Sequence, residues 1–181
     1  MNRFIQHIAA LVALTVPAAV WAAPEAADPA KYMTTSVAVS GSVETKLALR
    51  VEDLRNFPPQ QVVELTLQVR RGAPAGQEPQ RVKGVRLRDV LSRAAVVTHH
   101  YNDVKKMIVV ASASDGYKVV FSWNELFNTA VGDGVLVIFE RDGKPLANTE
   151  GQIALVSAAD FRAGSRHVKW LQSIEIRKAV E

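Results

Sequence analysis

The stretch Phe161-Arg162-Ala163-Gly164-Ser165-Arg166-His167-Val168-Lys169-Trp170, continued by 171–176, decides the fold. Its first part is a basic loop that contains Gly164 and Ser165. Its second part, from Leu171 to Ile176, is short and rich in branched residues, which is typical of a β-strand. Runs of the same kind come before it at 107–110, 118–121, 135–139 and 153–156. The C-terminal half is therefore predicted to consist mainly of short strands.

The N-terminal half continues this pattern with short helical segments between strands. Strands are expected at 37–43, 47–49, 62–69 and 82–85, and helical turns or helices at 51–54, 87–95 and 123–127. Asp142-Gly143 predicts a hairpin turn, because both residues readily adopt positive φ angles. Residues 73–80 form a Gly/Pro loop. We therefore predict a single α+β domain, β-rich and mixed, with short helices.

The first residues are not expected to belong to this domain. Asn2 and Arg3 lead into an apolar tract from Ile8 to Leu14, which is too short to span a bilayer and is built like a signal peptide. We expect a signal peptide at 1–22 with cleavage after Ala22, a flexible lead-in at 23–35 and the folded domain at 36–178. The mature protein is then expected in the periplasm.

Composition excludes several classes of site. The 181-residue chain contains no cysteine, so disulfides, zinc-thiolate sites, iron-sulfur clusters and cysteine nucleophiles are excluded. Lys and Arg exceed Asp and Glu by 22 to 18, and removal of the signal peptide deletes one of these basic residues. Such a mild excess in an exported protein argues against nucleic acid as a partner and favours a local anion site.

Four motifs in order resemble the sulfite-oxidase-type molybdopterin-binding domain. They are 84–91 (Gly-Val-Arg-Leu-Arg-Asp-Val-Leu), 113–117 (Ala-Ser-Asp-Gly-Tyr), 141–146 (Arg-Asp-Gly-Lys-Pro-Leu) and 166–171 (Arg-His-Val-Lys-Trp-Leu). The resemblance runs from Val37 to Ile176. It implies the β-rich α+β fold of that family, with the last motif and the loop before it lying against the molybdopterin.

One position departs from the family. The redox enzymes carry a molybdenum-ligating cysteine after a Leu-Gln pair, whereas here Leu67-Gln68 is followed by Val69, which offers no lone pair to a metal. The chain is thus similar to the small exported pterin-binding relatives of sulfite oxidase, which act as periplasmic sensors. This resemblance implies a bound pterin or molybdopterin-like ligand without molybdenum, no enzymatic activity, and a membrane-bound cyclic-di-GMP cyclase or phosphodiesterase as partner.

A pterin needs a stacking surface, a carboxylate and cations or backbone donors. Asp115 is the candidate carboxylate, since it can accept paired hydrogen bonds, and Tyr117 and Trp123 are the aromatic candidates. The cations expected at the ligand lie in the 161–170 loop or directly follow the 62–69 strand. Together with the histidine of that loop, these candidates are Arg70, Arg162, Arg166, His167 and Lys169.

Each candidate also has a structural interpretation. Asp115 can bond its own turn, the basic loop can be a solvated surface, and Tyr117 and Trp123 can cover the core. Trp170 is expected in the core. His99-His100 is not expected to share a metal, because adjacent side chains usually point apart. A hydrolase triad of Ser157 or Ser165 with His167 and Asp160 has no supporting spacing.

Two further interpretations stay open. The first is a molybdopterin-dependent oxidoreductase of the sulfite oxidase type that binds its cofactor through the dithiolene alone, without a cysteine ligand. The second is a domain for protein interaction in which the fold persists and the pocket has closed.

Overall fold

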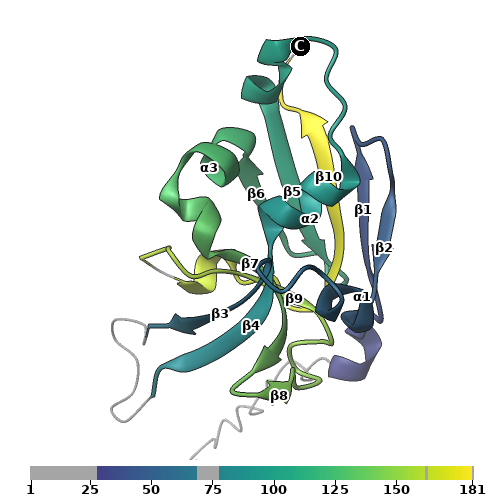
Figure 1. The fold of residues 1–181 in the computed structure, drawn as a ribbon. Coiled ribbons are helices and arrows are strands. Elements are labelled where there is room, and N and C mark those ends of the chain that lie inside the picture. Colours follow the sequence, from purple (N-terminus) through teal and green to yellow (C-terminus); the bar gives the residue numbers. More distant parts are fainter. Residues whose placement is uncertain (1–27, 69–77, 162, 181) are drawn as a thin grey trace, which may run out of the picture.

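Two five-stranded sheets form the frame of the molecule. The computed structural model describes residues 28–68, 78–161 and 163–180 (Figure 1). The first sheet has the order β2-β1-β10-β5-β6 and the second β3-β4-β7-β8, with β9 also paired to β7. The strands are β1 (Val37–Gly41), β2 (Leu47–Leu49), β3 (Val62–Leu67), β4 (Gln80–Arg86), β5 (Met107–Ala113), β6 (Lys118–Ser122), β7 (Val135–Arg141), β8 (Lys144–Pro145), β9 (Ala154–Ser157) and β10 (Leu171–Lys178).

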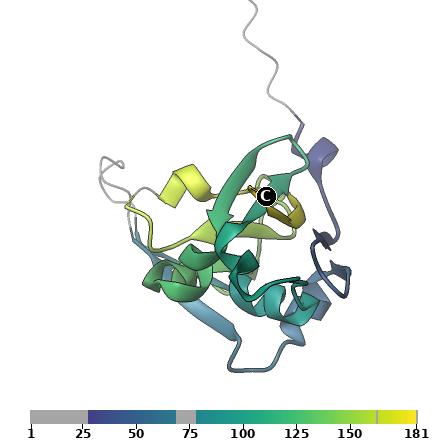
Figure 2. The ribbon, with the colours of Figure 1, turned by 90° about the horizontal axis from the view of Figure 1, so that it is seen from above.

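Short helices fill the space beside and between the sheets. The α-helices are α1 (Val51–Arg55), α2 (Leu87–Ala94) and α3 (Trp123–Asn128), and the 3-10 helices are η1 (Pro29–Tyr32), η2 (Tyr101–Lys106), η3 (Ala130–Gly134) and η4 (Ala163–Arg166). α2 contacts both sheets, and α3 packs against β5 and β6 (Figures 1 and 2). The predicted β-rich α+β fold is confirmed.

The two sheets share one main core. Alternate residues of a strand point to opposite faces of its sheet, so every second residue faces this core. Val39 of β1 and Ile174 of β10 meet Val85 and Val137 of the second sheet in this core. A smaller apolar cluster lies on the other face of the second sheet, where Leu136 and Ile138 are its most buried members together with Val82 and Ala154. The second sheet is therefore apolar on both faces.

A hairpin turn and a β-bulge determine the local geometry of the second sheet. Asp142 and Gly143 have φ angles of 51° and 74°, which fit the expected hairpin between β7 and β8. Between β4 and β7 the register shifts at Lys83 and Gly84, which marks a β-bulge. A Cβ on Gly84 would lie 2.3 Å from the carbonyl oxygen of Val137, so this close approach requires glycine.

Two features differ from the sequence expectations. η1 already forms at Pro29–Tyr32, ahead of the start expected near Ser36, because the Asp28 side chain caps it and Tyr32 packs against Trp170. Trp170 itself is half-buried rather than in the core. Its indole N–H donates to the carbonyl of Asn148 at 2.8 Å, and this bond keeps the ring at the edge of the sheet.

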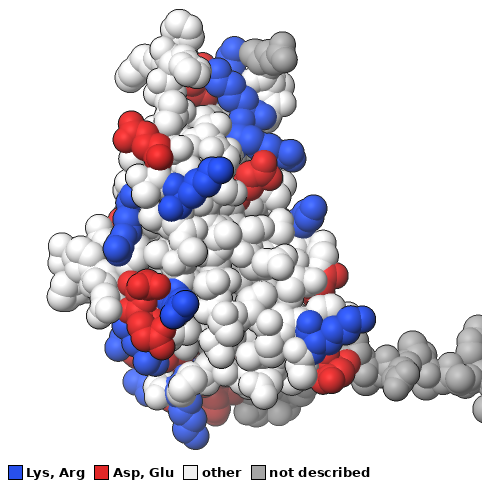
Figure 3. All heavy atoms as spheres, turned by 90° about the vertical axis from the view of Figure 1, so that its right-hand side faces the viewer, with Lys and Arg blue, Asp and Glu red and all other residues white. Residues whose placement is uncertain are grey.

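The surface on the β1–β2 side carries its charged side chains mainly around the margin (Figure 3). The exposed residues of these two strands are Ala38, Gly41 and Ala48, which are small and uncharged. Within the described part of the chain, no helix has the length and apolar character needed to cross a membrane.

Candidate functional site

The segment from Ser157 to Trp170 connects β9 to β10 and contains four of the eight predicted site residues. Val168 exchanges two backbone hydrogen bonds with Leu155, which fixes the middle of the segment against β9. The Ser114 N–H donates to the Trp170 carbonyl at 3.1 Å, and the Tyr117 hydroxyl donates to the Ser165 carbonyl at 2.8 Å. The structure therefore brings the 114–117 loop and the 157–170 segment together.

Arg166 lies in a network with two carboxylates. Its guanidinium donates to both oxygens of Asp160, with Nε 2.7 Å from Oδ2, and its Nη1 lies 2.6 Å from Oε1 of Glu125. The guanidinium also lies 4.5 Å from the centre of the Phe121 ring, and Asp160 accepts a further bond from Ser157. The hydrogen bond from Arg166 lowers the pKa of Asp160 despite desolvation, and the pKa of Arg166 is raised in return.

His167 belongs to a second network, centred on Glu150. His167 Nε2 lies 2.6 Å from Glu150 Oε1, and Arg141 donates to both oxygens of the same carboxylate. Arg141 also bonds Gln80 at 2.8 Å. Burial by itself would raise the pKa of Glu150, but hydrogen bonds from His167 and Arg141 outweigh it and lower the pKa to about 2.

The two networks separate the neighbours Arg166 and His167. Arg166 connects the segment to Glu125 of α3. His167 connects the segment to Glu150, which also holds Arg141 at the end of β7. Sequence reasoning missed the carboxylates Glu125, Glu150 and, as a partner of Arg166, Asp160. One local signal was available: Ser122 and Glu125 have the Ser-x-x-Glu spacing of a capping box, and the structure shows both of its hydrogen bonds.

The remaining predicted site residues have varied surroundings. Asp115 is exposed and accepts a bond from the Tyr117 N–H at 2.9 Å, which is the geometry of a turn aspartate. Trp123 stacks on Phe127 with ring centres 4.0 Å apart and packs against the main core. Lys169 is exposed and has no ion pair or hydrogen bond with the residues that the structure describes. Arg70 and Arg162 lie outside the described residues.

The geometry does not assemble a hydrolase triad. Ser157 and Asp160 are hydrogen-bonded at 2.8 Å, but His167 bonds Glu150 instead, so the histidine of the triad does not adjoin the serine. The N–H groups of His99 and His100 both donate to Asp103. Among the described residues, no cluster of His, Asp and Glu fits a metal ion.

These residues fit the organic part of a molybdopterin better than its metal. A pterin with a phosphate tail is planar, polar and anionic. The segment offers the exposed cation of Lys169 and the imidazole of His167, and the Tyr117 hydroxyl is bonded to its Ser165 carbonyl. The chain has no cysteine, so it cannot donate a thiolate to molybdenum.

Comparison with known proteins supports the resemblance carried by the four motifs. The model of the oxidoreductase molybdopterin binding domain matches residues 22–181. The fold is similar to the crystal structure of the sulfane dehydrogenase SoxCD from Paracoccus pantotrophus, with a TM-score of 0.58 and 20% identity over 86% of this chain. The chain spans 41% of the length of that protein chain. No curated protein matches the sequence.

These findings correct one expectation. The sequence pattern suggested that the protein is not an enzyme, because the molybdenum-ligating cysteine is missing. That expectation is contradicted, since the matching family is one of oxidoreductases. The match covers nearly the whole sequence, and the chain therefore belongs to the family of oxidoreductase molybdopterin-binding domains.

Proposed function

We propose that this chain is the cofactor-binding part of an oxidoreductase of the sulfite oxidase type, and that it holds a molybdopterin without a cysteine ligand. The observation that carries the proposal is the family match over residues 22–181. When bound, the cofactor supplies the metal centre that exchanges electrons with substrate. The protein's part is to bind, orient and shield that group.

Within the candidate site, the described residues divide into two roles. Lys169 is free to pair with the phosphate of the cofactor, while His167 is oriented by Glu150 at its Nε2. Arg166 has two carboxylate partners, so we assign it the role of positioning the 160–166 loop against α3 rather than of binding the anion.

The test is production of the full chain in a host that synthesises molybdopterin. Released pterin is measured by fluorescence and mass spectrometry, and molybdenum by elemental analysis on the same sample. Dye-linked oxidation of sulfite and thiosulfate is then assayed. We expect about one pterin and one metal ion per chain together with turnover. Folded protein that carries neither group from this host would contradict the proposal.

Two variants test the assigned residues. Lys169→Ala is expected to reduce the bound pterin about tenfold, because it removes a charge-assisted contact. Lys46→Ala is the matched control, since Lys46 is exposed and lies on the β1–β2 connection outside this segment. Equal pterin content in both variants would contradict the role of Lys169.

A second candidate function rests on the missing cysteine. In this proposal the bound pterin is also a signal, and the chain, exported to the periplasm by residues 1–22, changes the activity of a membrane-bound cyclic-di-GMP cyclase or phosphodiesterase. The test compares the cellular cyclic-di-GMP level in strains with and without this gene, with and without a block in pterin synthesis. A cyclic-di-GMP level that changes neither on loss of the gene nor on the block in pterin synthesis contradicts this second candidate function.

A further inference from the structure

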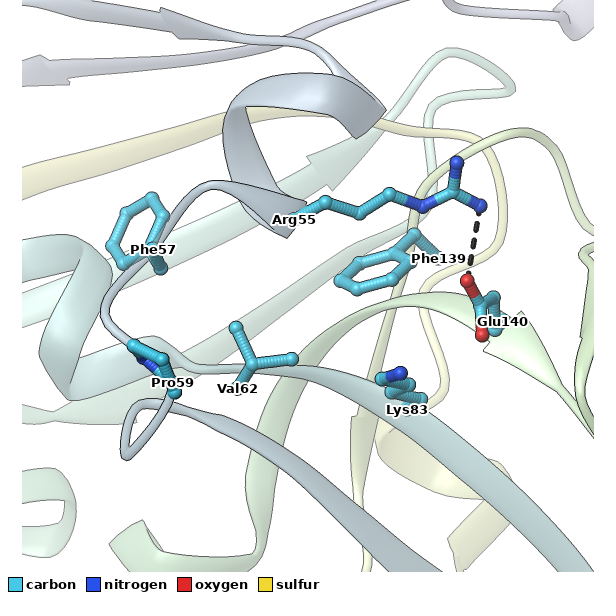
Figure 4. Close-up of a pocket in the computed structure, with 7 residues that line it drawn as sticks. All are labelled: Arg55, Phe57, Pro59, Val62, Lys83, Phe139 and Glu140. Carbon is cyan, nitrogen blue, oxygen red and sulfur yellow. Dashed lines mark hydrogen bonds and ion pairs between the residues drawn. The ribbon is translucent and has the colours of Figure 1, made fainter.

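A groove of about 420 Å³ lies between α1 and the second sheet, and the proposed cofactor site makes no use of it. Its floor is apolar, with Pro59 and Val62 at the surface and the buried rings of Phe57 and Phe139 beneath them. Figure 4 shows Arg55 reaching from α1 over the Phe139 ring toward Glu140. A volume of this size suits a small organic molecule.

The groove is on the opposite face of the second sheet from the Glu150 network. Val62 packs against the main core, whereas the next residue, Val63, packs against the smaller cluster. Lys83 pairs with Glu64 across the strands, two residues along from Val62, so it lies on the main-core face. Arg141 pairs with Val82, a member of the smaller cluster, so it lies on the other face. A ligand in this groove therefore cannot be the one held by His167.

The charged side chains of the groove leave an excess of positive charge. Lys83 lies between Glu64 and Glu140 in the sheet register, but each glutamate bonds an arginine instead. Arg55 Nη2 lies 3.0 Å from Glu140 Oε1, and Arg81 Nη1 lies 3.6 Å from Glu64 Oε1. Lys83 is half-buried, and its ammonium group makes no ion pair or hydrogen bond with the residues that the structure describes. Its ammonium group is left for an outside anion.

The apolar floor of the groove determines what kind of uncharged body the ligand has. Phe139 and Phe57 are 1% and 3% exposed and lie under the guanidinium groups of Arg55 and Arg93, so the apolar surface open to a ligand is that of exposed Pro59 and half-buried Val62. A flat apolar body packs well against such a surface. We propose that this groove binds a small organic anion with an aromatic or aliphatic body, whose carboxylate or sulfonate pairs with Lys83. This proposal does not depend on the proposed function.

The probe for the test is 8-anilinonaphthalene-1-sulfonate, with the uncharged N-phenyl-1-naphthylamine as its matched analogue. Fluorescence titration of the full chain gives both dissociation constants. We expect Lys83→Gln to weaken the sulfonate about tenfold and to leave the uncharged probe unchanged, because only the ion pair is lost. Lys83→Arg is expected to restore binding, and Lys46→Gln is the control on an exposed lysine elsewhere.

Two results would overturn the proposal. If Lys83→Gln binds the sulfonate as the unmodified chain does, the anion is not paired with Lys83. If it weakens both probes equally, the groove has changed shape and charge pairing is not the cause. Chemical shifts of labelled protein add a check on position: the sulfonate should move β4 and β7 signals near Lys83 and leave the 163–168 segment unchanged.

Discussion

At the scale of the residue, Glu150 is the buried carboxylate that holds Arg141 and His167 together. Its side chain is 10% exposed and that of Arg141 17% exposed. Glu150→Gln leaves the Arg141 charge without its carboxylate, so we expect the free energy of unfolding at pH 7 to fall by about 3 kcal/mol. Urea denaturation measures this. Glu44→Gln, on an exposed glutamate, is the control, and an unchanged midpoint in Glu150→Gln would show that the network contributes no stability.

The sequence predicted Arg166 and His167 as site residues but not the partners that each one has in the structure. Arg166 and His167 were expected together at a ligand because they are adjacent and basic. Arg166 ends η4 and His167 follows it, and the two side chains each meet an acid far along the chain: Glu125 is 41 positions from Arg166, and Glu150 is 17 from His167. Such pairings follow from how strands are arranged, and no local pattern reports that arrangement.

At the scale of the element, the bulge between β4 and β7 controls the fit of the second sheet. A Cβ on Gly84 would collide with the Val137 carbonyl, so Gly84→Ala is expected to destabilise the protein by about 3 kcal/mol. Gly116→Ala is the matched control. Gly116 has a φ of 92° but no atoms near its Cβ position, so only backbone strain of about 1 kcal/mol is expected. Equal losses in thermal or urea denaturation would refute the steric argument.

A helix cap couples a second element to the site. The Ser122 hydroxyl accepts from the Glu125 N–H at 3.0 Å at the start of α3, and the same Glu125 carboxylate holds Arg166. Ser122→Ala is expected to cost about 1 kcal/mol of stability, the usual loss for an N-cap. Ser36→Ala is the control, since the Ser36 hydroxyl has no hydrogen bond with the described residues. Equal stability of the two variants would contradict the cap's contribution.

The strands and helices were predictable from sequence because their signals are local. Runs of branched residues and the Asp142-Gly143 turn each report on a few neighbouring residues, and the strands and the hairpin form where these signals predict them. The division into two sheets was not predictable in this way. The parallel pairing of β1 with β10 joins residues more than 130 positions apart, and it depends on the shared core rather than on either strand alone.

At the scale of the whole molecule, three carboxylates make the free energy of unfolding depend on pH in the acidic range. Hydrogen bonds from Lys178 and the His100 N–H lower the pKa of Asp103 to about 2, Glu150 has a pKa of about 2, and the pKa of Asp160 is lowered by Arg166. Each group binds its proton more readily in the unfolded chain, so its contribution is complete above the ordinary carboxyl pKa and is lost as pH falls toward the folded value.

We therefore expect the free energy of unfolding to be nearly constant from pH 7 to about pH 5 and to fall steadily between about pH 4.5 and pH 2. Urea denaturation at half-unit steps of pH measures the curve. Glu150→Gln removes one of the three contributions, so its curve should start lower at pH 7 and fall less steeply in acid. The difference in slope between the two curves is the contribution of Glu150. The slope that remains in Glu150→Gln is the contribution of Asp103 and Asp160. A free energy of unfolding that is level down to pH 2.5 would contradict the lowered pKa values and, with them, the networks that link the 157–170 segment to both sheets.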